Sequence, residues 1–256
     1  FDARGGIQCD LTITRVGEDS FYVVTGTGFA THDFDWIKRN IAAGASSGVG
    51  ADVRLTDVTD TRSVLSLMGP ASREILSRVT NTDVTNLAFQ FATMQNIQIL
   101  GCDVMAIRIT YVGELGFELH MAVADAPCVY DELFMHGASL GLKNAGYRAI
   151  ESLRLEKGYR SWGSEIGPDH TPLEAGLGWA TKLSSDIDFL GRVALNEQRE
   201  TGVKKILAGF RVDHPDVVLL GRETIYRNGE RVGWLTSSGY GYTVKASLGY
   251  GYVRNS

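Results

Sequence analysis

The chain has few cysteines, and their number and spacing exclude two classes of protein. Among 256 residues there are three, Cys9, Cys102 and Cys128, which are widely spaced. An odd, scattered set does not make a disulfide scaffold and offers no zinc-binding spacing, but it fits a reducing compartment. The five histidines are also isolated from one another. The sequence alone therefore predicts no metal site.

Two further absences concern charge and long apolar runs. The net charge is −5, which argues against a nucleic-acid-binding protein that works through a broad basic face. No apolar run approaches the roughly 20 residues of a membrane helix. We therefore expect neither a nucleic acid nor a membrane as a partner. With 44% hydrophobic and 21% charged residues, the composition is that of an ordinary globular protein.

Hydrophobic patterns predict an α+β chain in two parts. Strand-like runs alternate with helical patterns up to about residue 203, and strand-like patterns dominate from residue 204. We interpret 1–203 as a mixed domain and 204–256 as a small all-β module. The chain starts without methionine and stops directly after a strand-like run. We therefore expect the first domain to be truncated at its N-terminus and the β module to be truncated as well.

Periodicity and turn residues place the individual elements. The predicted strands are 11–16, 21–25, 53–55, 63–68, 97–100, 104–110, 117–123, 206–212, 223–226 and 231–236, and the predicted helices are 33–41, 71–79, 125–140, 147–157 and 192–201. Asn228-Gly229 is a strong hairpin signal. On the helix 147–157, Glu151 and Arg154 are predicted to form a surface ion pair.

The segment 111–118, Tyr-Val-Gly-Glu-Leu-Gly-Phe-Glu, is the strongest candidate for a binding site. It joins two predicted strands through a turn that contains Gly113 and Gly116, and it carries Glu114 and Glu118. A carboxylate at a strand end, beside an aromatic ring, suits a planar ligand with an amide-like N–H edge, because it accepts two N–H bonds at once. The alternative interpretation is a hairpin with two exposed acids.

A second candidate lies near the N-terminus, where Gly5-Gly6 leads into a strand that starts at Asp10. An acid at a strand end can lie in a cleft with a raised pKa, or stabilise a developing cation. The alternative is an ordinary turn aspartate. Cys9 has no paired histidine in view, so we interpret it as a small buried residue rather than a nucleophile.

The glycine-rich run 24–29 follows a strand and precedes a helix, as a dinucleotide-binding loop does. The fingerprint requires a third glycine, but Thr31 stands at that position. We predict Thr31 and Asp33 as N-caps of the following helix, and an aspartate there would repel a pyrophosphate. This run therefore does not indicate a nucleotide site.

Five motifs taken together resemble the glycine-cleavage T-protein (aminomethyltransferase) family, which binds tetrahydrofolate. They are Gly5-Gly6-x-x-x-Asp10, Met68-Gly69-Pro70-Ala71, Tyr111-x-Gly-Glu-x-Gly-Phe-Glu118, Glu151-Ser-Leu-Arg-Leu-Glu156 and Thr236-Ser-Ser-Gly239. Each is weak alone, but their order and spacing follow the family along the whole chain. The resemblance implies a T-protein-like fold, with antiparallel sheets, packed helices and a small C-terminal β module that is barrel-like.

Within that family, the chain most resembles the folate-binding C-terminal region of dimethylglycine and sarcosine dehydrogenases. Residues 149–160 and 162–174 are typical of those enzymes, and Ile150 stands where T-proteins proper usually have an arginine. The resemblance implies that Asp10 lies near folate N5 and N10 and stabilises an iminium. It implies that Glu118 binds the pterin N–H groups and that Tyr111 lines the same pocket. Glu114 is either a second contact or a turn acid.

The function implied by the resemblance is one-carbon transfer in a flavin-dependent dehydrogenase, with the oxidised N-methyl group captured as 5,10-methylenetetrahydrofolate. The implied partners are folate, an N-methylglycine-type substrate or its iminium or formaldehyde product, and a flavin domain. FAD is expected only in an N-terminal region absent from this chain. Two alternatives stay open, namely a T-protein aminomethyltransferase and a non-catalytic folate-binding relative. The expected location is a bacterial cytoplasm or the mitochondrial matrix.

Overall fold

A computed structural model describes residues 1–46, 52–214 and 216–255. They form an α+β structure, as predicted, in two compact units. The central unit is Thr56–Lys157, and the terminal unit combines Phe1–Leu55 with Gly158–Ser256. The division of the chain at residue 203 stays a prediction.

The central unit is built on a four-stranded antiparallel sheet with the order β3-β6-β5-β4. Its strands are β3 (Arg62–Met68), β4 (Met94–Ile99), β5 (Cys102–Ile107) and β6 (Gly116–Ala122). Its helices are α2 (Ser72–Val79), α3 (Ala126–Gly137) and α4 (Tyr147–Lys157), with short 3₁₀ turns at Thr59–Thr61, Val123–Asp125 and Ala138–Leu140.

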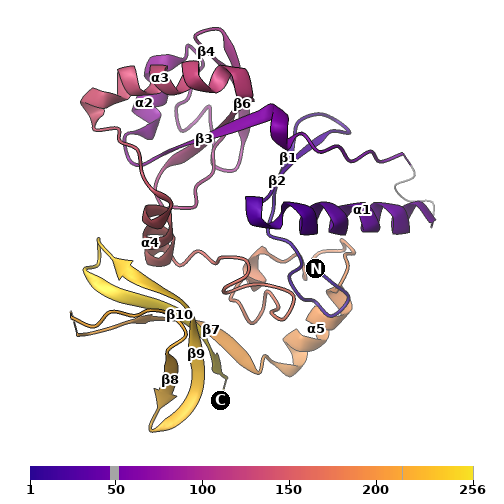
Figure 1. Cartoon of the computed structure of the whole chain (residues 1–256). Coiled ribbons are helices and arrows are strands. Elements are labelled where there is room, and N and C mark those ends of the chain that lie inside the picture. Colours follow the sequence, from indigo (N-terminus) through magenta and orange to yellow (C-terminus); the bar gives the residue numbers. More distant parts are fainter. Residues whose placement is uncertain (47–51, 215, 256) are drawn as a thin grey trace. The chain divides into compact units, whose positions relative to one another are not determined.

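The core of the central unit lies between α2, α3 and one face of this sheet (Figure 1). Side chains alternate between the two faces along a strand. Phe117 and Leu119 of β6 point into the core with Leu76 of α2, and all three are completely buried. Glu118 and His120 therefore lie on the face opposite α2 and α3. The strand period thus separates the candidate binding residue from the hydrophobic core.

The terminal unit contains an N-terminal hairpin, two α-helices and a second sheet. Its elements are β1 (Thr12–Arg15), β2 (Phe21–Val24), the 3₁₀ helix η1 (Thr27–Phe29), α1 (Ala30–Ser46), the 3₁₀ helix η5 (Gly178–Ala180), α5 (Arg192–Thr201), β7 (Lys205–Arg211), β8 (Thr224–Arg227), β9 (Glu230–Gly241) and β10 (Ala246–Arg254). The last four strands form an antiparallel sheet with the order β7-β10-β9-β8. Within the described residues this sheet is open and does not close into a barrel.

The β8–β9 hairpin confirms the Asn-Gly signal. Asn228 and Gly229 both have positive φ, at 54° and 82°, which is the conformation that a two-residue hairpin turn with the twist of the strands requires. The predicted pairs 11–16/21–25 and 104–110/117–123 are also antiparallel hairpins. Local turn chemistry and alternation were sufficient to predict these three pairings.

Three local predictions are wrong. Residues 53–55 form no strand, because a short apolar pattern does not by itself supply a neighbouring strand to pair with. Helix α1 begins at Ala30, so Thr31 and Asp33 lie inside its first turn and are not N-caps. Arg154 is only 1% exposed, although its predicted partner Glu151 does accept its Nε–H at 3.1 Å. The predicted ion pair is therefore formed, but its arginine is buried, and only the Glu151 side chain, which is 40% exposed, reaches the surface.

A buried carboxylate joins the loop after α4 to the C-terminal sheet. Glu165 is completely buried, and its carboxylate accepts hydrogen bonds from Ser161 N at 2.9 Å, the Thr236 hydroxyl at 3.0 Å and the Ser237 hydroxyl. The Tyr252 hydroxyl donates to the Glu165 carbonyl at 2.8 Å. A buried carboxylate is tolerated when its oxygens are satisfied in this way. This network fixes the loop on which the N-terminal segment lies.

Gly6 allows the N-terminal segment to approach that loop closely. Ile7 N donates to the His170 carbonyl at 3.0 Å, and a Cβ on Gly6 would lie 2.1 Å from the Pro168 carbonyl oxygen. We expect Gly6→Ala to lower the free energy of unfolding by about 1–3 kcal/mol in chemical denaturation. Gly28→Ala is the control, because its Cβ would meet nothing within 4 Å. Equal stabilities of the two variants would contradict the close approach.

His170 makes the stability of the terminal unit depend on pH. Its ring stacks on Tyr252 with centroids 4.4 Å apart, and burial, followed by the positive charge of Lys205, lowers its pKa below 6.5. The folded state then binds fewer protons than the unfolded state, so stability is lost as the pH falls below about 6.5. We expect His170→Gln to reduce the loss of unfolding free energy between pH 7.5 and 5.5. Denaturation at both pH values measures this, and identical pH dependences would refute it.

Candidate functional site

The segment 111–118 forms the end of the turn and the first residues of β6 in the β5–β6 hairpin. Ile107 on β5 and Ser66 on β3 are the register partners of Glu118 on β6. Gly113 has a φ of +77°, a conformation that glycine adopts without strain. A Cβ on Gly116 would lie 2.0 Å from the Met68 sulfur. Gly113 is thus favoured by its backbone conformation and Gly116 by the close approach of the Met68 side chain. Glu118 lies between two neighbouring strands.

Glu118 is a partly buried carboxylate that lies beside His120. Its Oε2 lies 3.3 Å from Nε2 of His120, and the side chains are 22% and 0% exposed. In the part of the chain that the structure describes, the other carboxylate oxygen accepts no hydrogen bond. This carboxylate can therefore accept N–H groups from a ligand while His120 orients it.

The sequence analysis missed His120. It stands two residues after Glu118 on the same strand, so the period of two places both side chains on one face. Because it is a single histidine in an apolar run, it gave no signal of its own. The alternation of side chains along this strand could have identified His120, because it places His120 on the same face as Glu118.

Tyr111 and Glu114 lie in the turn that precedes β6. The Tyr111 side chain is 38% exposed, and Glu114 is exposed as well. The fold therefore brings three of the four predicted site residues, Tyr111, Glu114 and Glu118, into one hairpin of the central unit. An exposed ring and a half-exposed carboxylate close in sequence are the components of a site for a planar, N–H-bearing ligand.

Asp10, the fourth predicted residue, belongs to the terminal unit, just before β1. Its side chain is accessible to solvent, and among the described residues no group donates a hydrogen bond to it. Neighbouring protein atoms remove part of its hydration, which raises its pKa, and the charge of Asp33 raises that pKa further. A carboxyl group of this kind is suited to taking up or releasing a proton.

Asp33 of α1 is surrounded by polar side chains. It is 3% exposed, its Oδ1 lies 2.9 Å from Nδ1 of His32, and the Thr25 hydroxyl donates to its Oδ2. Cys9 lies beside it, and burial together with Asp33 raises the pKa of the Cys9 thiol to about 12. A thiol with so high a pKa is protonated at neutral pH. Cys9 is only partly buried, and its assignment as a non-nucleophile stays a prediction. The sequence analysis found no histidine paired with Cys9, but the structure places His32 close to it, through Asp33.

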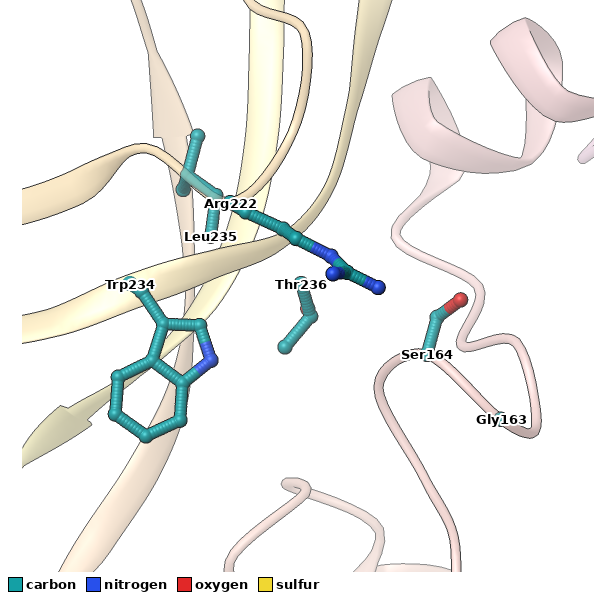
Figure 2. A pocket seen from close by; sticks show the side chains of 6 residues that line it. All are labelled: Gly163, Ser164, Arg222, Trp234, Leu235 and Thr236. Atoms are coloured by element: carbon teal, nitrogen blue, oxygen red, sulfur yellow. The ribbon is translucent and has the colours of Figure 1, made fainter.

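A cavity of about 420 Å³ lies elsewhere in the terminal unit. It is lined by Gly163, Ser164, Arg222, Trp234, Leu235 and Thr236. Figure 2 shows the Arg222 guanidinium extended across the opening toward Ser164, with the Trp234 indole at its side. None of the four predicted site residues lines this cavity. It is a separate hollow beside the C-terminal sheet.

Among the described residues, no helix is both long enough and apolar enough to cross a membrane.

Comparison with known proteins identifies the domain type. Residues 1–185 match the family model described as the GCVT N-terminal domain, and residues 205–256 match the glycine cleavage T-protein C-terminal barrel domain. The crystal structure of aminomethyltransferase T of the glycine cleavage system from Bartonella henselae aligns with a TM-score of 0.80 and 27% identity. That alignment covers 99% of this chain and 66% of the other. The T-protein fold expected from the motifs is confirmed.

Two curated relatives match almost the whole chain. Mouse mitochondrial sarcosine dehydrogenase is 40% identical and human mitochondrial dimethylglycine dehydrogenase is 36% identical, each over 98% of this chain. The chain spans 28% of the length of either relative. It is thus similar to a T-protein-like region within longer dehydrogenases.

Proposed function

Because the chain belongs to the glycine-cleavage T-protein family, we propose that it binds tetrahydrofolate and serves as the one-carbon transfer region of a sarcosine or dimethylglycine dehydrogenase-like enzyme. The observation that carries the proposal is the Glu118 carboxylate. This carboxylate is partly buried on the sheet face opposite α2 and α3, beside the buried His120. It belongs to the hairpin that carries the family motif. The sequence identities to the two dehydrogenases support placing the chain in the dehydrogenase branch of the family.

Glu118 and Tyr111 fit the pterin end of folate. A pterin presents an amino group and a ring N–H along one edge, and an ionised carboxylate accepts both in a bidentate arrangement. The 38% exposed Tyr111 ring offers an apolar wall to a flat ligand. Glu114 is exposed in the turn, so we assign it a second and weaker contact with the ligand.

Asp10 fits the reacting end. Tetrahydrofolate, when bound, supplies the nitrogen atoms that accept the one-carbon unit. The Asp10 carboxylate would hold positive charge that develops at the one-carbon centre, and it would carry the proton released when a folate N–H is lost. A positioned carboxylate acts in this way through electrostatic stabilisation and general acid–base catalysis. The absence of competing hydrogen bonds from described residues leaves it available for that role.

The one-carbon donor distinguishes this proposal from its main alternative. In the leading version, the donor is the iminium or formaldehyde produced when a flavin oxidises an N-methylglycine-type amine, with the flavin bound by another part of the protein. In the alternative, the donor is the aminomethyl group of a lipoyl carrier protein. Ile150, at the position where T-proteins usually carry arginine, and the matches to the two dehydrogenases favour the first version.

The transfer is tested with ¹³C-labelled formaldehyde and tetrahydrofolate. We expect the purified protein to accelerate the appearance of labelled 5,10-methylenetetrahydrofolate above the spontaneous rate, with saturation in folate. Nuclear magnetic resonance of the labelled carbon follows both species in the same tube. Folate binding without any acceleration would contradict transfer and would favour a non-catalytic folate-binding relative. Acceleration only with an aminomethylated lipoyl carrier would favour the T-protein alternative.

A further inference from the structure

We propose that Cys9, His32 and Asp33 form a binding site for one divalent transition-metal ion of the zinc type. One ligand atom from each, a thiol sulfur, a ring nitrogen and a carboxylate oxygen, lie within 4.8 Å of one another. It is the single grouping of this kind among the described residues. These three donor types are the ones that zinc uses in proteins. The site requires nothing of the folate-binding hairpin.

The distances between the donor atoms suit a shared ion. Nδ1 of His32 lies 2.9 Å from Oδ1 of Asp33. Metal bonds from zinc to nitrogen and oxygen are about 2.0–2.2 Å long, so two such ligand atoms on one tetrahedral ion lie about 3.4 Å apart, and a separation of about half an ångström more would admit it. Cys9 comes from the segment before β1, and the other two residues come from the first turn of α1. The ion would therefore link two elements that are distant in sequence.

The local charge also favours a cation. Asp33 is 3% exposed, and its ion-pair partner in the described part of the chain is His32, whose side chain is 39% exposed. The nearby Asp10 carboxylate, whose interaction with Asp33 is repulsive, adds a second negative charge. A buried carboxylate with so little compensation is costly. A divalent cation would balance the charge of the Asp33 carboxylate together with that of the Cys9 thiolate formed on binding.

Neighbouring side chains hold two of the ligands in place. The Thr25 hydroxyl donates to Oδ2 of Asp33, which leaves Oδ1 for the ion. The Trp162 ring lies 5.3 Å from the His32 ring, and its own indole N–H donates to the Ile7 carbonyl at 3.1 Å. Outer partners of this kind orient metal ligands in known sites. The pocket for the ion is thus supported by residues that are themselves hydrogen-bonded.

Binding replaces one covalent bond. The Cys9 sulfur–hydrogen bond breaks, a sulfur–metal bond forms, and the proton leaves to solvent. His32 and Asp33 exchange their mutual hydrogen bond for bonds to the ion. Three protein ligands leave the fourth tetrahedral position to water, which reaches the site on the exposed side of His32.

Cobalt(II) is the direct probe, because a cobalt–thiolate bond absorbs in the near ultraviolet. The Cys102 and Cys128 thiols contact each other and would compete, so the titration uses the purified Cys102→Ser/Cys128→Ser protein, which retains Cys9 alone. We expect a saturable band at about one cobalt per chain, bleached by zinc(II), with proton release detected by a pH indicator. Adding Cys9→Ser should abolish the band.

His32 supplies the decisive variant because its side chain is 39% exposed, so its replacement leaves the fold intact. We expect His32→Ala to weaken cobalt binding at least tenfold. His136→Ala is the matched control, since His136 is also 39% exposed and also pairs with a carboxylate, that of Glu132 at 3.0 Å. A folded Cys102→Ser/Cys128→Ser protein with no thiolate band would overturn the proposal. A band that His32→Ala does not weaken would overturn it as well.

Discussion

Asp10→Asn is expected to slow one-carbon transfer by about 10²–10⁴-fold, the range that a positioned general acid–base group contributes. Asparagine keeps the size of the side chain but neither carries charge nor exchanges a proton at neutral pH. Because Asp10 is accessible and accepts no hydrogen bond from described residues, the protein should fold normally. The measurement is the folate-saturated rate of ¹³C transfer from formaldehyde.

Asp35→Asn is the control for this effect. Asp35 lies on α1 with a 54% exposed side chain and pairs with Arg39 four residues later. Its replacement removes an acid from the same unit without touching the candidate site. If both variants transferred carbon at the wild-type rate, Asp10 would have no catalytic role. If both were equally slow, the effect would reflect net charge rather than position.

Glu118→Gln is expected to weaken tetrahydrofolate binding at least tenfold, which corresponds to about 1.4 kcal/mol. The reason is that hydrogen bonds to a charged group contribute about 1.5–3 kcal/mol each, and the amide presents one acceptor where the carboxylate presented two. The amide also places an N–H donor against the ligand's own donors. Calorimetric titration of both proteins measures the difference.

Glu114→Gln makes the same chemical change four residues earlier in the same hairpin. Glu114 is exposed in the turn, so we expect a loss of affinity below about threefold, less than 1 kcal/mol. Equal losses in the two variants would show that overall charge near the hairpin, rather than bidentate acceptance by Glu118, governs binding. An unchanged affinity in Glu118→Gln would remove that residue from the site.

The sequence predicted the β5–β6 hairpin well because most of its determinants are local. Alternation along β6 and the positive φ at Gly113 are properties of the hairpin itself, whereas Gly116 also answers to the close approach of Met68 from β3. The same holds for the β8–β9 turn at Asn228 and Gly229, where positive φ is required at both residues. Elements of this kind need no information about the rest of the chain.

What the sequence did not predict depends on residues that are distant from one another. Arg154 was placed on the surface because an amphipathic pattern counts every arginine as polar, whereas the fold buries it beside Glu151. The contact of Cys9 with the His32–Asp33 pair spans more than twenty residues, and no spacing rule for metal ligands covers it. Tertiary packing determines such contacts, and the hydrophobic periodicity of the sequence does not predict them.

The assignment of Asp10 and Glu118 rests on different information. Both were selected because an acid at a strand end can bind or transfer protons, and the resemblance to a folate-binding family gave them distinct roles. The structure adds an environment to each residue, a raised pKa for Asp10 and a histidine neighbour for Glu118. The roles themselves stay predictions that the two variants test.

The most direct test of the central claim is calorimetric titration of the folded chain with tetrahydrofolate. We predict saturable binding with about one folate per chain, weakened by Glu118→Gln and retained by Glu114→Gln. Circular dichroism of the same sample establishes that the protein is folded. A folded chain that produces no binding heat and retains no folate in equilibrium dialysis would contradict the account.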